Sequence, residues 1–300
     1  MHDLYSNGGK YQKGGASQSD RPKRRTSPAA KVLTVVAVVL FSLVTALAVY
    51  GWQVSRSQAE FDRLAAMTRQ PETDPQITRP PETRNPEETT SAEIEASADQ
   101  TEAPREILPQ YQELYEKNPD FWGWVTLPET ILDYPVMHTP QEPEKYLYAD
   151  FDGAYSYPGT PFLDAQCNYE SDNLLIYGHN MNSGSMFRAL LKYDGCLYWK
   201  DHPSFILNTL YEEREYQVLA AFYDRVYYSR ENVFKFYEFI EAADQREFDE
   251  AVAQIKDKAL YDTGVTAQYG DQLAMLVTCS SHTDNGRFVL VGCYHPETTE

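Results

Sequence analysis

A long uncharged segment near the N-terminus constrains this chain more than any other feature. No charged residue occurs from Val32 to Trp52, and as a helix rising about 1.5 Å per residue the segment would span roughly 31 Å. That length matches the hydrocarbon core of a bilayer, so we expect a separate N-terminal transmembrane helix over residues 32–52, in contact with lipid. Tyr50 and Trp52 would then lie at the membrane surface, where aromatic residues are common.

Basic residues are concentrated on the N-terminal side of this segment. Residues 1–31 contain two carboxylates and seven cations, namely Lys10, Lys13, Arg21, Lys23, Arg24, Arg25 and Lys31. Because basic flanks stay in the cytoplasm, we predict a cytoplasmic tail over residues 1–31 and an extracellular location for everything after the membrane. The alternative is a cleaved signal peptide, since Ala46-Leu47-Ala48 resembles a cleavage site, but the apolar segment continues beyond it.

The composition changes twice after the apolar segment. Helical periodicity continues weakly through residues 53–69, and residues 70–104 are then rich in Pro, Glu and Thr and contain no aromatic residue. Such a segment cannot bury enough apolar surface to offset its chain entropy. We therefore expect a juxtamembrane helix and a disordered acidic stalk over residues 53–104, followed by a globular domain over residues 105–300.

The charge and the cysteines exclude several classes of protein. A net charge of -19 disfavours a nucleic-acid partner, because phosphate binding requires a basic surface. The four cysteines, Cys167, Cys196, Cys279 and Cys293, have irregular spacing that matches neither a zinc site nor a disulfide framework. A disulfide between Cys167 and Cys196 remains an alternative. A free thiol kept in an exported protein usually needs a reason, and catalysis is one.

The globular domain is predicted to be mostly β. A helix is expected from Pro109 to Lys117 and another from Asp244 to Leu260, both from i, i+3, i+4 apolar spacing. Seven or eight short strands with few helices predict a closed, mostly antiparallel barrel. The apolar runs that predict strands are WGWVTL, ILDYPVM, GTPFLD, NLLIYG, REYQVLAAFYD, LAMLVTC and RFVLVGCY.

Three of these strands carry residues suited to covalent catalysis. His179 follows the strand that ends at Tyr177 and Gly178, Cys279 ends the LAMLVTC strand, and Arg287 begins the next strand. A thiolate is a nucleophile, a neighbouring imidazole can move its proton, and a guanidinium can stabilise an oxyanion. Each residue alone also fits a structural role, as a capping His, a packed Cys or a surface Arg.

Other histidines compete with His179 for the role of acid and base. His282 is three residues from Cys279 but lies in the polar loop SSHTDNG, where geometry is poorly held. His179 ends an apolar strand, and Gly178 before it would allow a close approach to another strand. The other candidates lie beside prolines or near the C-terminus, namely His138, His202 and His295.

These segments together resemble the sortase family, and its class B in particular. The family's His lies in a Y-G-H-N segment, matched by Tyr177–Asn180, and its Cys closes a T-L-x-T-C motif, matched by Met275–Cys279 except that Met275 replaces the first Thr. Arg287 matches the family's Arg on the following strand. Further similarity lies at Asn118-Pro119-Asp120, Gly123-Trp124, Ile131–Val136 and Gly184–Phe187, so that it covers roughly Leu108 to Tyr294.

The resemblance implies an eight-stranded sortase barrel with an N-terminal helix and a helix inserted before the Cys strand. It implies a cysteine transpeptidase that cleaves a C-terminal sorting signal at a Thr-Gly-type bond through a thioester. The substrate would be a surface protein or pilin, and the acceptor a peptidoglycan peptide amine or a pilin lysine. His179, Cys279 and Arg287 would be catalytic, and Tyr177, Asn180 and Thr278 would bind substrate. No metal or other cofactor is expected.

Two other functions stay open on sequence alone. A secreted cysteine endopeptidase of wall peptides would use water in place of an amine, although papain-like and NlpC-type enzymes place Cys before His in the chain, and here His179 comes first. A non-catalytic, membrane-anchored binding barrel would leave Cys279 inert. The resemblance to sortases implies that substrate specificity lies within residues 223–261.

Overall fold

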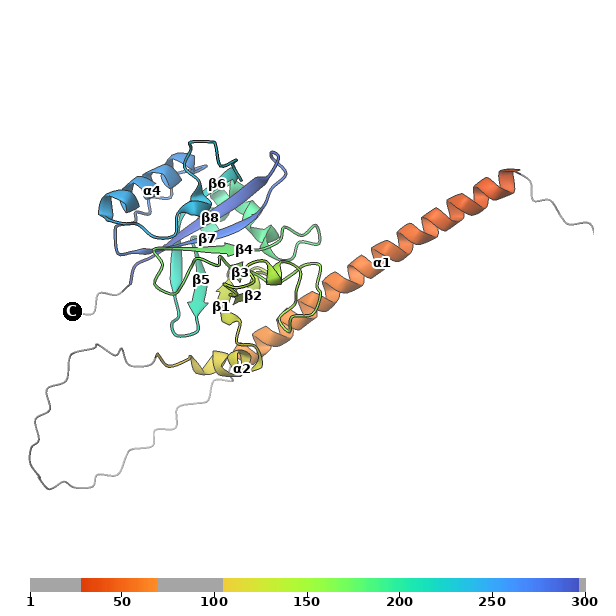
Figure 1. Ribbon diagram of the computed structural model, residues 1–300, viewed down its shortest axis with the longest axis horizontal. Coiled ribbons are helices and arrows are strands. Elements are labelled where there is room, and N and C mark those ends of the chain that lie inside the picture. Colours follow the sequence, from red (N-terminus) through yellow and green to blue (C-terminus); the bar gives the residue numbers. More distant parts are fainter. Residues whose placement is uncertain (1–27, 70–104, 297–300) are drawn as a thin grey trace, which may run out of the picture. The chain divides into compact units, whose positions relative to one another are not determined.

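Eight strands between Phe121 and Tyr294 close into a barrel (Figure 1). The computed structural model describes residues 28–69 and 105–296. The order around the barrel is β1-β2-β3-β4-β7-β8-β6-β5, which confirms the predicted fold class. The strands are β1 (Phe121–Thr126), β2 (Asp133–Met137), β3 (Phe162–Leu163), β4 (Asn173–Tyr177), β5 (Ser204–Thr209), β6 (Glu215–Arg225), β7 (Gln272–Cys279) and β8 (Gly286–Tyr294).

The pairing of β4, β7 and β8 determines which residues share one end of the barrel. Strands β4 and β7 are parallel, with Tyr177 opposite Val277, so their C-terminal ends lie on the same rim. Strands β7 and β8 are antiparallel, with Cys279 opposite Arg287. The other described pairings are antiparallel except β2–β3. The rim therefore collects residues that are about a hundred positions apart in the chain.

Seven of the strands fall on the apolar runs that predicted them, and β5 was missed. Its residues alternate between half-buried and buried positions, with Phe205 and Leu207 pointing inward. Ile206 between them makes three consecutive apolar residues, and polar residues flank them, so no clear period of two is visible in the sequence. Strand β5 pairs with β1 on one side and β6 on the other, and it closes the barrel.

Both helices predicted for the globular domain are present. Helix α2 (Pro109–Lys117) begins with Pro109 at its first turn, where a missing N–H is tolerated. Helix α4 (Gln245–Lys258) is capped by the Asp244 carboxylate, which accepts a hydrogen bond from the Glu247 N–H at 2.9 Å. The helix contacts β6, and its buried face is formed by Phe248, Ala251, Val252 and Ile255.

Several short helices in the connections were not predicted. They lack the length over which helical periodicity becomes visible. They are η1 (Lys145–Leu147), η2 (Phe187–Asp194), α3 (Cys196–Asp201) and η3 (Phe236–Glu238).

Helix α1 (Pro28–Thr68) contains the apolar segment and continues beyond it, as the sequence predicted. Within the described residues, the span Lys31–Thr68 is the one helix long and apolar enough to cross a membrane. The chain divides into two compact units, Met1–Val49 and Tyr50–Glu300. The predicted basic tail of residues 1–27 and the predicted stalk of residues 70–104 lie outside the described residues.

The second unit includes the last turns of α1, so it begins before the domain start near Arg105 that composition suggested. Phe61 and Leu64 are buried, and the Phe61 ring packs edge-on against Tyr134 with centroids 4.9 Å apart. The Tyr134 hydroxyl donates to Gln58 at 3.2 Å. These contacts join residues 50–68 to the barrel.

Candidate active site

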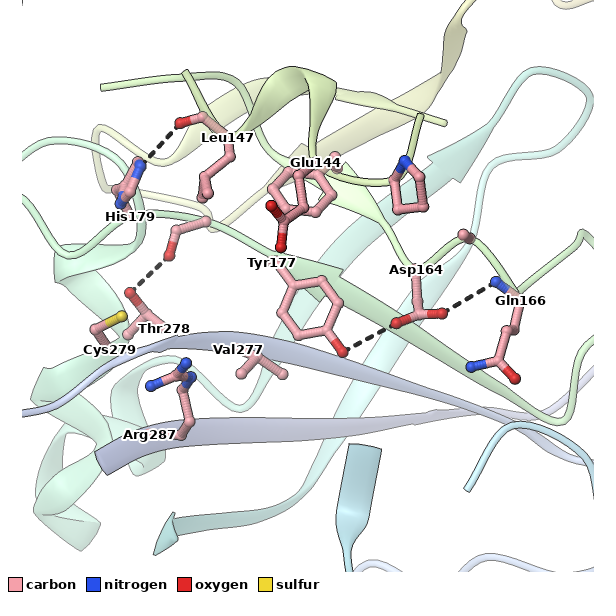
Figure 2. Close-up of a pocket in the computed structure, with 14 residues that line it drawn as sticks. Glu144, Leu147, Asp164, Gln166, Tyr177, His179, Val277, Thr278, Cys279 and Arg287 are labelled. Atoms are coloured by element: carbon pink, nitrogen blue, oxygen red, sulfur yellow. Dashed lines mark hydrogen bonds between the residues drawn. The ribbon is translucent and has the colours of Figure 1, made fainter. Parts of the chain in front are cut away.

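Cys279 and Arg287 lie opposite each other at the rim where β7 ends and β8 begins. Strand β7 is buried along its length up to Thr278, and Cys279 is its first exposed residue. A pocket of about 610 Å³ opens at this rim and is lined by Cys279, Arg287 and His179 together (Figure 2). The fold therefore brings the three candidate catalytic residues of the sequence analysis to one cavity. Their catalytic roles stay predictions.

The His179 imidazole is held by one backbone carbonyl and by one neighbouring aromatic ring. Its Nε2 lies 2.9 Å from the Leu147 carbonyl oxygen, and because that oxygen can only accept, Nε2 must donate. In the neutral imidazole Nδ1 then carries no proton and can accept one. In Figure 2 this second nitrogen is on the side of the ring that faces Cys279. The Tyr148 ring packs against the imidazole with centroids 5.4 Å apart.

Gly178 is required by a neighbouring ring. A β-carbon at this position would lie 2.7 Å from the Phe187 ring, which is too close for any side chain. The sequence analysis expected the glycine to allow an approach to another strand, and the close neighbour is instead the first residue of η2. The Phe187 N–H also donates to the His179 carbonyl oxygen at 2.9 Å, so η2 fixes the backbone of the histidine.

Two predicted substrate-binding residues, Thr278 and Asn180, connect the His and Cys segments. The Thr278 hydroxyl donates to the Gly178 carbonyl oxygen at 2.7 Å, and the Asn180 amide donates to the Cys279 carbonyl oxygen at 2.8 Å. Arg188 in turn donates to the Asn180 side chain at 3.1 Å. Both side chains therefore hold the two segments in register, whether or not they also contact substrate.

The third predicted substrate-binding residue, Tyr177, faces the pocket. Its hydroxyl donates to the Asp164 carboxylate at 3.1 Å, and both residues line the cavity. Burial, and secondarily the Asp164 charge, raises the pKa of Tyr177 well above its usual range. The phenol therefore stays protonated and can act as a hydrogen-bond donor in the pocket wall.

Arg287 is oriented by the turn that precedes it. Its Nη1 donates to the carbonyl oxygens of Asn285 at 3.2 Å and Gly286 at 3.0 Å. Within the part of the chain that the structure describes, Nε and Nη2 have no hydrogen-bond partner. The guanidinium is thus fixed at one nitrogen and keeps N–H groups for a ligand beside Cys279.

The other cysteines differ from Cys279. Cys167 and Cys293 are buried, and burial raises the pKa of each thiol to about 12. Cys196 is exposed at the start of α3. All four thiols are free, so the alternative disulfide between Cys167 and Cys196 is not formed.

A second group of side chains could suit a metal ion. Asp271, Cys293 and His295 each place one ligand atom within 4.8 Å of the others, and they are the one such group in the described residues. The donors are already used among themselves. His295 pairs with Asp271 at 2.8 Å, and the Cys293 thiol donates to the same carboxylate at 3.8 Å.

Much of the pocket wall was not predicted from the sequence. It comes from the loop around η1 and from β3 and the turn after it, where no motif stood out. Only the prolines and paired acidic residues of that loop could have drawn attention to it. The residues missed are Pro143, Glu144, Leu147, Phe162, Asp164, Ala165 and Gln166.

Comparison with known proteins agrees with the fold. No family model matches the chain. The chain is 29% identical over 195 residues to sortase B of Listeria monocytogenes, covering 62% of this chain and 74% of that protein. It is 23% identical over 175 residues to sortase B of Staphylococcus aureus, covering 58% and 68%.

Solved structures show the same likeness. A crystal structure of sortase B from Bacillus anthracis superimposes with a TM-score of 0.55 at 25% identity, covering 64% of this chain and 89% of that one. A Staphylococcus aureus sortase B–substrate complex shares the fold with a TM-score of 0.56 at 23% identity, covering 63% and 86%. The curated relatives and the solved structures support the sortase family, class B, for this chain. The chain is therefore an enzyme of the sortase transpeptidase type.

Proposed function

We propose that this protein uses Cys279 to cleave a C-terminal sorting signal and transfers the released acyl group to an amine. The observation that carries the proposal is the rim itself. Cys279 is exposed, pairs in register with Arg287, and shares one pocket of about 610 Å³ with His179. A nucleophile, a proton carrier and an oxyanion donor are what acyl transfer requires.

In the first half-reaction the thiol proton moves to His179 Nδ1, the nitrogen that the Leu147 contact leaves unprotonated. The sulfur attacks the threonine carbonyl carbon of a Thr-Gly-type bond, and the N–H groups of Arg287 stabilise the oxyanion. The C–N bond then breaks, and His179 returns the proton to the leaving amine. The product is a thioester on Cys279.

In the second half-reaction an amine attacks the thioester carbonyl carbon. His179 takes the amine proton, the C–S bond breaks, and the thiol is restored. The acceptor proposed is a peptidoglycan peptide amine or a pilin lysine. The runner-up, a wall endopeptidase, would differ at this step alone, with water as the nucleophile.

We also propose that α1 anchors the enzyme in the cell membrane, with residues 1–31 in the cytoplasm and the catalytic domain outside. The apolar exposed surface of α1 and the basic flank in the sequence support this orientation. Protease added to wall-stripped cells should remove the domain. Cleavage of the N-terminal tail with protection of the domain would reverse the orientation.

The thioester is the test of the chemistry. Incubation with a sorting-signal peptide and no acceptor should add the mass of the acyl fragment to the wild-type protein, and hydroxylamine should remove it. Cys279→Ala should show no adduct, whereas Cys196→Ala, which removes the other exposed thiol, should show the same adduct as wild type. An adduct on Cys279→Ala would refute the assignment.

A further inference from the structure

Four exposed aromatic residues lie beside the candidate active site: Tyr148 and Tyr157 are in ring contact, and Trp52 and Tyr155 line one shared cavity. Tyr155 is 71% exposed, Trp52 60%, Tyr148 47% and Tyr157 42%. Tyr157 contacts Tyr148 with ring centroids 6.4 Å apart, and it also contacts the half-buried Tyr50 of α1 at 5.7 Å. We call these five residues the ring strip. Clustered exposed rings of this kind mark an interaction surface, whereas isolated ones do not.

The tyrosines of the ring strip are presented by a well-braced turn. The Ser156 N–H donates to the Tyr148 carbonyl oxygen at 2.9 Å, and Ala149 bridges to Tyr155 across the turn. At the tip, the Asp150 carboxylate accepts from the Ala154 N–H at 2.7 Å. These hydrogen bonds fix the backbone of the turn. The fold therefore keeps the tyrosine rings exposed.

The same turn is fastened to α1 just beyond the apolar segment. The hydroxyls of Ser57 and Ser156, both buried, lie 2.9 Å apart in a hydrogen bond. Ser57 follows Trp52 by five residues, which is about 7.5 Å along a helix. The headgroup layer on one side of a bilayer is about 5–8 Å thick. A helix that leaves the hydrocarbon at Trp52 would therefore hold this turn at headgroup depth.

We propose that the ring strip docks the catalytic domain onto the headgroup layer of the membrane that α1 spans. This rests on the proposed membrane anchor. Tyr and Trp favour that layer, since each combines an apolar ring with a polar group that stays hydrated. The occupant is lipid because the strip is continuous with the end of the apolar segment. The Arg56 guanidinium, 5.6 Å above the Trp52 ring, supplies a cation for lipid phosphate.

The docking would place the active site at the membrane surface. Tyr148, at one end of the ring strip, packs against the imidazole of His179. The chain's net charge of -19 disfavours adsorption to anionic lipid by charge alone, so the rings carry most of the contact and Arg56 adds to it. A substrate held in the membrane by an apolar tail would then meet the pocket without leaving the surface.

The test uses the full-length protein in liposomes that contain a lipid with a nitroxide on its headgroup. Tyr155→Trp adds a fluorophore at the most exposed ring of the strip. Leu197→Trp, at a side chain 74% exposed on α3, is the matched control. The emission added by Tyr155→Trp should be quenched at both low and high salt, and that added by Leu197→Trp should not. Quenching of the parent protein at Trp52 reports the anchor independently.

Three outcomes would overturn the docking. Unquenched Tyr155→Trp emission with quenched Trp52 would leave the anchor intact and the strip in water. Equal quenching at Leu197→Trp would indicate unspecific adsorption, and loss of quenching at high salt would indicate attraction by charge. None of these readouts depends on turnover, so they do not test the transpeptidase proposal.

A second pair of measurements separates lipid from peptide as the occupant. Tyr155→Ser with Tyr157→Ser should lower the transfer rate several-fold for a membrane-tethered substrate and leave the rate for a soluble peptide unchanged. Tyr228→Ser, at an exposed tyrosine outside the ring strip, should change neither rate. Equal losses on both substrates would make the strip a peptide-binding surface and refute the lipid assignment.

Discussion

Two groups of Cys and His side chains lie at opposite ends of the β7–β8 hairpin. At one end Cys279 is exposed, faces Arg287 across the pair of strands, and opens into the pocket that His179 lines. At the other end, Cys293 is buried beside the Asp271 carboxylate, which His295 also contacts. Each end carries a Cys and a His. Cys279 is exposed opposite a guanidinium, whereas Cys293 is buried beside a carboxylate.

The difference shows which surroundings favour a reactive thiolate in this fold and which suppress it. Burial, and secondarily the charge and hydrogen bond of Asp271, raises the pKa of Cys293 to about 12, so the reactive thiolate is scarce. Cys279 has a guanidinium as its strand partner and is open to solvent. A Cys near a His is therefore not sufficient. The sign of the neighbouring charge and the exposure to water determine whether a thiol in this fold can ionise and react.

Alkylation should show the largest contrast between the two ends. In a Cys167→Ala, Cys196→Ala background, Cys279 should react readily with iodoacetamide at about pH 8. Cys293 has a pKa of about 12, so only about one thiol in 10⁴ is ionised at that pH, and it should stay almost unlabelled over the same time. Peptide mass spectrometry measures both rates. Unfolded protein should label at both positions, and comparable rates in folded protein would erase the contrast.

Replacing His179 and replacing His295, at the two ends of the hairpin, should affect the reaction rate very differently. Loss of a general acid and base costs about 10²–10⁴ in rate, so His179→Ala should lower kcat/KM by that factor and flatten its bell-shaped pH profile. His295→Ala should keep both the rate and the profile. His282→Ala should do the same, because its ring lies against Tyr223 outside the pocket. A flat profile in His282→Ala would transfer the role to that residue.

The contribution of Arg287 to the rate should depend on the planar shape of its guanidinium as well as on its positive charge. Arg287→Lys keeps the positive charge but loses the planar set of N–H donors, so kcat should fall by about 10²–10³. Arg246→Lys, on the exposed face of α4, is the control and should have no effect. Steady-state transfer kinetics give the comparison. Near-normal turnover in Arg287→Lys would reduce the role of Arg287 to that of a simple cation.

The buried thiol should make a small, pH-dependent contribution to stability. The unfolded thiol ionises near pH 9.0 and the folded thiol near pH 12, so between these values the unfolded state releases a proton that the folded state keeps. The free energy of unfolding must then fall as pH rises. From about pH 8 to 10, wild type should lose about 1 kcal/mol more than Cys293→Ala in urea unfolding. Parallel pH dependences would mean that Cys293 ionises normally.

The sequence predicted the parts of this structure that depend on apolar runs and turn residues. The run that ends at Cys279, the following strand with Arg287, and helix α4 were all identified because their periodicity is strong and their ends are marked. The barrel followed from the number of such runs. Strand β5 was missed because its apolar residues are consecutive and its flanks polar.

The contacts that orient the site could not be predicted in the same way. The group that fixes the His179 tautomer is the Leu147 carbonyl, and any residue at that position would supply it, so no side-chain signature exists. The need for Gly178 comes from the Phe187 ring, which reaches it through the fold. Packing of residues 50–68 on the barrel likewise depends on a surface that only the finished fold creates.

The parallel pairing of β4 with β7 has a consequence for the order in which the enzyme becomes active. His179 is synthesised a hundred residues before Cys279, on the strand that pairs with it, and Arg287 follows on the next strand. Contacts between residues so far apart in sequence form slowly, because a long loop must close first. If Cys279 acts as proposed, the chain stays chemically inactive until β4 and β7 pair, so that barrel closure and completion of the candidate site are one event.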